Sequence, residues 1–255
     1  MTARKPNPHV DFRMECEHNA AVAAADPLLN QQTRDWFLQS CRHRYSYNFT
    51  WLGRPIIQYP QDMVALQELV WNVRPDLIVE TGIAHGGSLI LSASLLALLD
   101  LCEGRTDPRR VVGVDIDIRE HNRQAIESHP LSSRITLIEG SSVAPQIVEQ
   151  VQTLAAQASC VLVILDSNHT DEHVYQELHA YAPLVAIDSY CVVMDTVVEL
   201  MPDEFFADRP WGRGNSPQTA VHRYLAEHPE FVIDKALENK LLISVAPEGY
   251  LKRIG

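Results

Sequence analysis

The sequence predicts an α/β fold, in which a doubly wound, mostly parallel seven-stranded sheet carries helices on both faces and follows an N-terminal helical extension. Two observations support this class. Short apolar runs alternate with longer segments whose apolar residues recur at helical spacing. A glycine-rich turn follows the first of these runs, at the point where a helix is expected to begin. At 255 residues, the length suits one such domain.

The N-terminal part, residues 1–60, is expected to form the helical extension, and residues 61–255 the main domain. The extension contains an alanine-rich stretch at 20–25, the pair Trp36 and Phe37, and an aromatic run at 45–51. It is predicted to pack on the domain. The alternative is a lid or an oligomer contact, because aromatic residues are enriched at interfaces.

The remaining elements follow in order. Residues 61–73 have the apolar spacing of an amphipathic helix that ends before Pro75. Strands that alternate with helices form parallel sheets covered on both faces. The expected strands are 77–79, 111–114, 135–138, 161–165 and 190–193, and the expected helices between them are 88–101, 120–128, 144–156 and 172–181.

The C-terminal part contains a polar segment with glycine and proline at 202–217, which is a candidate lid. A helix at 219–227 follows. Strands at 231–233 and 240–245 are then expected to close the sheet as an antiparallel pair.

Composition limits the partners and the compartment. Thirty-three acidic residues against 21 basic ones give a net charge of -12, which disfavours nucleic acid and anionic membrane surfaces. Five cysteines without a CxxC pair suggest neither a zinc knuckle nor a disulfide framework, so a reducing cytoplasm is expected. The N-terminus carries prolines and charges where a signal peptide needs an apolar core.

The glycine-rich turn, residues 80–88, is expected to approach a ligand closely. Gly82, Gly86 and Gly87 allow a sharp turn, and Ser88 is expected to cap the helix that follows. The spacing G-x-x-x-G-G departs from the dinucleotide pattern G-x-G-x-x-G. Glu80 would repel a pyrophosphate but attract the ammonium or sulfonium of S-adenosylmethionine. The turn therefore favours a cationic cofactor, the alternative being an ordinary helix-initiating turn.

Acidic and hydroxyl residues after the next two strands are further cofactor candidates. Asp115 can accept hydrogen bonds from ribose hydroxyls, as the acid after the second strand does in dinucleotide folds. Asp117 is a weaker candidate, with a solvent-facing acid as the alternative. Ser141 is a candidate on the adenine side, or a helix N-cap.

Polar residues at the ends of the next two strands are the candidates for chemistry. Asp166 and Asp195 could bind a hard divalent cation through oxygen. His169 could take a proton from an acceptor hydroxyl, with His173 as the reserve candidate.

Long motifs resemble the cephalosporin hydroxylase-like family. They are the run 45–88, VVGVDIDIR at 111–119, ILDSNHTDEHV at 164–174, GRGNSPQTAV at 212–221 and KLLISVAPEGYLKRI at 240–254. Despite its name, the family looks like class I S-adenosylmethionine-dependent O-methyltransferases with a Rossmann-like fold, related to enzymes that use magnesium. The resemblance implies natural-product chemistry on a small-molecule acceptor.

The resemblance also implies roles for particular residues. It implies cofactor contacts from Glu80, Gly82, Ser88, Asp115 and the region of Ser141, and metal contacts from Asp166 and Asp195. Together with the features of the residues themselves, the expected cofactor set is Glu80, Gly82, Gly86, Ser88, Asp115, Asp117, Ser141 and Asp166, and the expected catalytic residues are His169 and Asp166. Where the family has Glu-Asp-Thr, this chain has Met194, Asp195 and Thr196. A thioether is a poor ligand for magnesium. Either Mg²⁺ binds weakly through the two aspartates and water, or the enzyme works without metal and relies on His169, or metal-dependent activity has been lost.

Three functions follow from these features. The first is methyl transfer to a hydroxyl of a sugar or secondary metabolite. The second is a hydroxylase or hydroxylase component, in which His169, His173 and Asp166 would form an iron site. The third is a non-catalytic cofactor-binding subunit. Self-association is expected from the aromatic N-terminal segment.

Overall fold

The computed structural model describes residues 8–255. Within this range, seven strands form the main sheet: β3 (Leu77–Thr81), β4 (Arg110–Asp115), β5 (Ile135–Glu139), β6 (Val161–Leu165), β7 (Tyr190–Val193), β8 (Phe231–Ile233) and β9 (Tyr250–Arg253). Their spatial order is β5-β4-β3-β6-β7-β9-β8, with β9 antiparallel to both of its neighbours and the other pairs parallel. The predicted doubly wound, mostly parallel sheet is confirmed.

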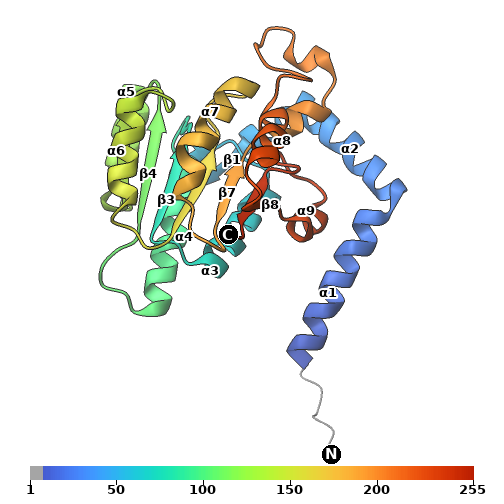
Figure 1. Cartoon of the computed structure of the whole chain (residues 1–255), viewed down its shortest axis with the longest axis horizontal. Helices are drawn as coiled ribbons and strands as arrows, with labels where there is room; N and C mark the ends of the chain where they lie inside the picture. Colours follow the sequence, from blue (N-terminus) through green and yellow to red (C-terminus); the bar gives the residue numbers. More distant parts are fainter. Residues whose placement is uncertain (1–7) are drawn as a thin grey trace, which may run out of the picture.

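Helices cover both faces of this sheet (Figure 1). One apolar layer lies between the sheet and α3 (Pro60–Val73), α4 (Gly87–Glu103), α5 (Glu120–Glu127) and α9 (Lys235–Leu241). The other lies between the sheet and α6 (Pro145–Ala155), α7 (Asp171–Tyr181) and α8 (Pro217–Glu227). Because side chains of a strand alternate between faces, Ile78 packs in the first layer while Leu77 and Val79 pack in the second.

The N-terminal part begins with α1 (Pro8–Ala25) and α2 (Pro27–Arg42), and α1 lies alongside α9 at the margin of the domain (Figure 1). Asp26 caps α2 by accepting hydrogen bonds from the backbone N–H groups of Leu28 and Leu29. Phe37 of α2 stacks on Tyr59, with ring centroids 4.9 Å apart. An aromatic contact therefore fastens α2 to the start of α3.

A small hairpin follows α2, and the sequence did not predict it. It consists of β1 (Phe49–Trp51) and β2 (Arg54–Ile56), paired antiparallel. Leu52 and Gly53 in its turn both have positive φ, at 45° and 87°. Two-residue turns of this kind match the twist of the flanking strands.

The predicted strand at 240–245 is wrong. That stretch contains the end of α9 and a loop, and the strand that pairs with β7 and β8 is β9, further along the chain. Asp234 starts α9 by accepting a hydrogen bond from the backbone N–H of Leu237. The buried Asp62 then accepts hydrogen bonds from Ser244 and from the backbone of Val245, which holds the loop under α3 instead of in the sheet.

Short 3-10 helices lie in the connecting segments: η1 (Tyr45–Asn48), η2 (Ser132–Arg134), η3 (Ala182–Leu184), η4 (Thr196–Leu200) and η5 (Asp203–Phe206). The segment 202–217 contains η5 and projects beyond the sheet between β7 and α8, drawn in orange in Figure 1. Among the described helices, none is both long and apolar enough to pass through a lipid bilayer.

Candidate active site

The register of the sheet brings the candidate residues to one edge. Thr81, the last residue of β3, pairs with Val114 of β4 on one side and with Leu165 of β6 on the other. The chain winds outward from β3 to β5 and then returns to β6 on the opposite side of β3. Gly82 and Asp166 therefore lie at the point where the strand order reverses, which is where open α/β sheets bind ligands.

Gly82 lets the chain turn where no side chain would fit. Its φ is +79°, and a Cβ placed on it would lie 2.0 Å from the backbone oxygen of Asp166. Gly86 also has φ +79°, but there a Cβ would meet the Ile126 side chain of α5 at 2.4 Å. The first glycine allows β3 and β6 to meet closely, and the second allows α4 to start beneath α5.

Two residues that the sequence analysis did not single out hold this turn. The guanidinium of Arg54 donates hydrogen bonds to the backbone oxygen of His85 and to the side chain of Asn122, 3.1 Å away in the latter case. Asn122 in turn donates to the backbone oxygen of Ala84 at 3.1 Å. The sequence feature that could have identified Asn122 is its spacing. It lies four residues before Ile126, on the side of α5 that is buried.

Glu80 is buried beneath this turn. Only 1% of its surface is exposed, because residue 80 shares a sheet face with Ile78 and points toward α3 and α4. Ser88 donates a hydrogen bond to Oε1 of Glu80, so the expected helix cap at Ser88 is wrong and Gly86 occupies the N-cap position. The other oxygen, Oε2, has no hydrogen-bond partner within residues 8–255.

An enclosed cavity collects further carboxylates next to Glu80. Asp166 and Met194 line it because they follow β6 and β7 on the same sheet face, and Asp62 enters from α3. Gln58 also lines it, and its Oε1 atom is buried without a partner in the described chain. The cavity lining therefore includes two buried acceptor oxygens, on Glu80 and Gln58, without donors in the described chain.

Burial and mutual repulsion shift the pKa values of these acids. Burial raises the pKa of Glu80 to about 7, opposed by the hydrogen bond from Ser88. Burial also raises the pKa of Asp62 to about 6, although Ser244, Val245 and Tyr250 donate hydrogen bonds to it. For Asp166, burial and then the negative charges of Asp195 and Glu80 raise the pKa well above the usual range. A cation in this cavity would relieve the repulsion.

Asp62 was missed in the sequence. The sequence feature that could have identified Asp62 is its spacing. Its carboxylate lies four residues before Leu66 and seven before Leu69, on the apolar face of the predicted helix. A charged group on such a stripe is buried and needs partners. The partners lie far along the chain, at Ser244 and Tyr250.

Asp166, His169 and Asp195 come together as the sequence predicts for strand-end residues. One ligand atom from each lies within 4.8 Å of those of the other two. Nε2 of His169 is 3.5 Å from a carboxylate oxygen of Asp195, whose backbone φ is +54°. Met194, next to Asp195, is only 6% exposed and faces the cavity with Asp166.

The projecting segment 202–217 reaches this group through Trp211. The Trp211 ring meets His169 edge-on, with centroids 4.8 Å apart. Glu199 closes the base of the segment by accepting hydrogen bonds from Ser216 Oγ at 2.7 Å and from the backbone N–H of Gly214 at 2.9 Å. The sequence analysis did not single out Trp211, because nothing local links it to His169.

A more open hollow lies on the other side of the glycine turn. It is lined by Gly82, Asp115, Ser141, Ser142 and His173, among others. Oδ2 of Asp115 accepts a hydrogen bond from the backbone N–H of Ile83 at 2.9 Å, which fixes the carboxylate at the mouth of the turn.

Asp117 lies outside the set of residues that line this hollow. Its side chain is 70% exposed and lies 3.7 Å from Arg119. Its backbone N–H donates to the side chain of Asp115 at 3.1 Å. Ser141, in contrast, lines the hollow, and Ala144 takes the N-cap position of α6 that was the alternative role for this serine.

His173 turns away from His169 and Asp166. Its Nε2 atom lies 3.0 Å from Ser142 Oγ and 3.1 Å from Ser167 Oγ, and Ser167 donates to the buried Glu177. In the described part of the chain, the metal-type group around Asp166 contains only one histidine. The two-histidine iron site needed by the hydroxylase alternative is therefore not assembled.

The linings of the two cavities carry polar groups of the kinds that S-adenosylmethionine would need. Unpaired oxygens of Glu80 and Gln58 offer acceptors to an ammonium, and Asp115 offers a carboxylate to ribose hydroxyls on the other side of Gly82. The fit to magnesium is partial. Asp166 and Asp195 supply hard oxygen ligands, but Met194 contributes none.

The sheet order, with a reversed last strand, and the site at the β3–β6 crossover define a class I methyltransferase. The sequence profile of the Rhamnosyl O-methyltransferase/CmcI family matches residues 43–254. The chain belongs to this family, which confirms the resemblance seen in the motifs. It is an S-adenosylmethionine-dependent O-methyltransferase with a small-molecule acceptor.

Individual relatives agree with this assignment. The rhamnosyl O-methyltransferase of Mycobacterium leprae is 29% identical over 221 residues, which cover 83% of this chain and 88% of the relative. That of Mycobacterium tuberculosis is 29% identical over 212 residues, covering 80% and 78%. A solved structure of CmcI in its Mg-SAM form shares the fold, with a TM-score of 0.54 and 19% identity over 82% of this chain and 78% of that one.

Replacing Gly82 by alanine should disrupt the crossover, because the new Cβ would collide with the backbone of Asp166. Gly214→Ala is a matched control, since Gly214 has the same φ of +79° and nothing lies within 4 Å of its would-be Cβ. The control should lose about 1–2 kcal/mol of unfolding free energy from the left-handed backbone alone. Gly82→Ala should lose at least about 2 kcal/mol more in urea denaturation. Equal losses would contradict the close approach.

Replacing Glu80 by glutamine should stabilise the protein at high pH. The pKa of Glu80 rises from 4.5 to about 7 on folding, so the native state of the wild type loses stability as pH climbs through that interval. Relative to the wild type, Glu80→Gln should gain roughly 1–3 kcal/mol of unfolding free energy between about pH 5 and pH 8.

The control for this experiment is Glu139→Gln at the end of β5, where the carboxylate is 48% exposed and paired with Arg123. It removes a carboxylate that lies outside the cavity and so measures the effect of losing one exposed charge. If the difference in unfolding free energy between Glu80→Gln and the wild type stays constant from about pH 5 to pH 8, the carboxylate of Glu80 is not buried in its charged form.

Proposed function

We propose that the enzyme methylates a hydroxyl group of a sugar carried on a small molecule. The observation that carries this proposal is the convergence of His169, Asp166 and Asp195 at the edge of the carboxylate-lined cavity. A base next to a cation-binding cavity suits transfer of a methyl group from a sulfonium to an oxygen. The rhamnosyl O-methyltransferases among its relatives support a sugar as the acceptor.

We assign the cofactor to the strand ends around β3. Glu80 receives the ammonium of the methionine part, and Asp115 receives the ribose hydroxyls. Ser88 orients Glu80, and the hollow beside Ser141 holds the adenine. The full proposed set is Glu80, Gly82, Gly86, Ser88, Asp115, Asp117, Ser141 and Asp166, with Asp117 acting through its backbone contact to Asp115.

His169 acts as the general base in this proposal. When bound, the cofactor would supply an electrophilic methyl group, whose bond to sulfur breaks to leave a neutral thioether. His169 would take the proton from the acceptor hydroxyl whose oxygen receives that methyl group. Asp195, with a carboxylate oxygen 3.5 Å from Nε2, orients the ring. Trp211 meets the ring edge-on and helps to fix its orientation.

A divalent cation would be held by Asp166 and Asp195, with water in place of a third carboxylate. When bound, Mg²⁺ would draw the acceptor oxygen toward the methyl group and lower the pKa of its hydroxyl. The crowding of negative charge around Asp166 supports a cation at this position. Met194 makes the binding weaker than a glutamate would.

The remaining assignments concern the whole molecule. We propose residues 1–60 as an extension and 61–255 as the methyltransferase domain. Self-association through α1 is supported by its exposed apolar side chains, Phe12, Met14 and Val22, which are 56–66% exposed. A cytoplasmic location is supported by the five cysteines, all of which are free.

Two substitutions should separate catalysis from cofactor binding. His169→Ala should lower kcat on a rhamnoside acceptor by roughly 100-fold or more while the Kd for S-adenosylmethionine stays unchanged. Glu80→Gln should instead weaken cofactor binding in calorimetric titration. If wild-type protein with cofactor and divalent cation methylates no rhamnoside or related glycoside, the sugar proposal fails. If His169→Ala retains full kcat, the base is elsewhere.

Restoring a carboxylate at position 194 should strengthen the metal site. Met194→Glu should bind Mg²⁺ at least about tenfold more tightly than the wild type, because it adds a hard oxygen ligand. Met194→Gln is the matched control, with a similar shape and no charge. Calorimetric titration with Mg²⁺ measures both. No gain over the glutamine variant would mean that residue 194 does not face the cation.

A further inference from the structure

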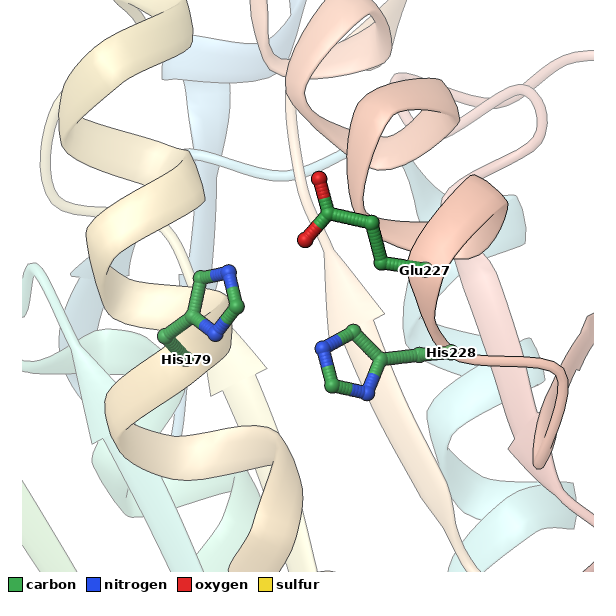
Figure 2. Close-up of side chains that lie close together, drawn as sticks. All are labelled: His179, Glu227 and His228. Atoms are coloured by element: carbon green, nitrogen blue, oxygen red, sulfur yellow. The ribbon is translucent and has the colours of Figure 1, made fainter.

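A second group of possible metal ligands lies away from the active site. It consists of His179 in the last turn of α7, Glu227 at the end of α8, and His228, the C-cap residue of α8. One ligand atom from each lies within 4.8 Å of those of the other two, and Figure 2 shows the three side chains pointing toward one another between the helices. His179 is eight residues beyond the start of α7, about 12 Å along the helix from the end that carries His169.

Hydrogen bonds with a neighbouring carboxylate and a neighbouring hydroxyl orient two of these side chains, His228 and Glu227. Nδ1 of His228 lies 2.9 Å from Oε1 of Glu230. Because a carboxylate accepts the hydrogen bond, the ring proton stays on Nδ1, and Nε2 keeps a lone pair that can bind a metal. A carboxylate behind the ring is the usual support of a metal-binding histidine. Tyr175 donates a hydrogen bond to Oε2 of Glu227 at 2.9 Å, so that Oε1 remains available.

Aromatic contacts hold both imidazoles in place. The ring of His228 stacks on Tyr224, with centroids 4.0 Å apart and an interplanar angle of 16°. The ring of His179 meets Tyr224 edge-on at 5.2 Å and Tyr175 edge-on at 4.5 Å. Tyr224 is only 1% exposed, so the platform under both rings is rigid. Ligands that are fixed before binding lose little entropy when an ion arrives.

The ligand types select the ion. Two imidazole nitrogens and one carboxylate oxygen match Zn²⁺ with water in the fourth position, whereas Mg²⁺ and Ca²⁺ prefer oxygen ligands throughout. We propose that His179, Glu227 and His228 form a binding site for Zn²⁺ or a similar borderline divalent cation, and that the ion joins the far ends of α7 and α8.

The position of the ion suggests a structural role. The N-terminal ends of the same two helices are already joined, because Asn215, before α8, accepts a hydrogen bond from the backbone N–H of Asp171 at 2.9 Å. α7 begins two residues after His169, and α8 begins where the projecting segment returns. An ion at the opposite ends would hold the helices at both ends and so steady the two loops that frame the active site.

Zinc titration of protein without a histidine tag tests this proposal. The variants are made in an Asp166→Asn, Asp195→Asn background, which removes the carboxylates of the active-site group. We expect one Zn²⁺ per chain to remain in this background, measured by competition with a chromophoric chelator. His179→Ala and His228→Ala should each weaken this binding by about 100-fold or more, and Glu230→Gln by about 10–100-fold, as for other supporting carboxylates.

His222→Ala is the matched control. His222 is also a histidine of α8, and its Nε2 lies 2.7 Å from Glu248, but it is not part of the group. It should bind zinc like the background. Zn²⁺ should also raise the Tm of the background and of His222→Ala by roughly 5 °C or more at hundredfold excess over Kd, and leave His179→Ala unchanged. Circular dichroism without metal checks that each variant folds.

Two results would overturn the proposal. One is a background protein that binds no Zn²⁺ at micromolar concentration. The other is binding that survives in folded His179→Ala and His228→Ala. Neither result bears on methyl transfer, since the group lies apart from His169 and Asp166.

Discussion

Parallel pairing of β3 with β4 on one side and β6 on the other is the constraint on which the site depends. It sets the ends of three strands at one level, so that Asp115, Gly82 and Asp166 follow side by side. The pleat then decides which face each neighbour takes. Glu80 points under α4, where it meets Ser88, and Asp166 and Met194 point into the same cavity. Strand register therefore determines which polar side chains meet at this edge of the sheet.

That geometry concentrates negative charge in a place shielded from water. Glu80, Asp62 and Asp166 all have raised pKa values because burial disfavours their ionised forms and, for Asp166, because the other acids repel it. Without a ligand, burial of these acids and the repulsion between them destabilise the folded protein. A positively charged ligand would reduce this destabilisation. A cation that bound in this cavity would recover part of the free energy that the folded chain spends when it buries these groups.

The sequence was sufficient for features governed by local rules. Alternating apolar runs identified the strands, and residues at consecutive strand ends, such as Asp115, Asp166 and Asp195, had to meet at one edge. The rest depended on contacts between distant segments. Arg54 reaches the glycine turn from a hairpin, and Asp62 holds Ser244 and Val245 in a loop although their β-branched, apolar surroundings resemble a strand. No local pattern reveals which distant partner a residue will find.

The segment between η4 and α8 is closed at its base by Glu199, which holds Ser216 and Gly214, and its Trp211 ring meets the ring of His169. In the same segment, Phe205 and Phe206 pack against the cluster that contains Phe37 of α2 and Tyr59. The segment therefore links the N-terminal extension to the surroundings of His169. A change in its length or sequence would alter the packing of α2 as well as the space beside this histidine.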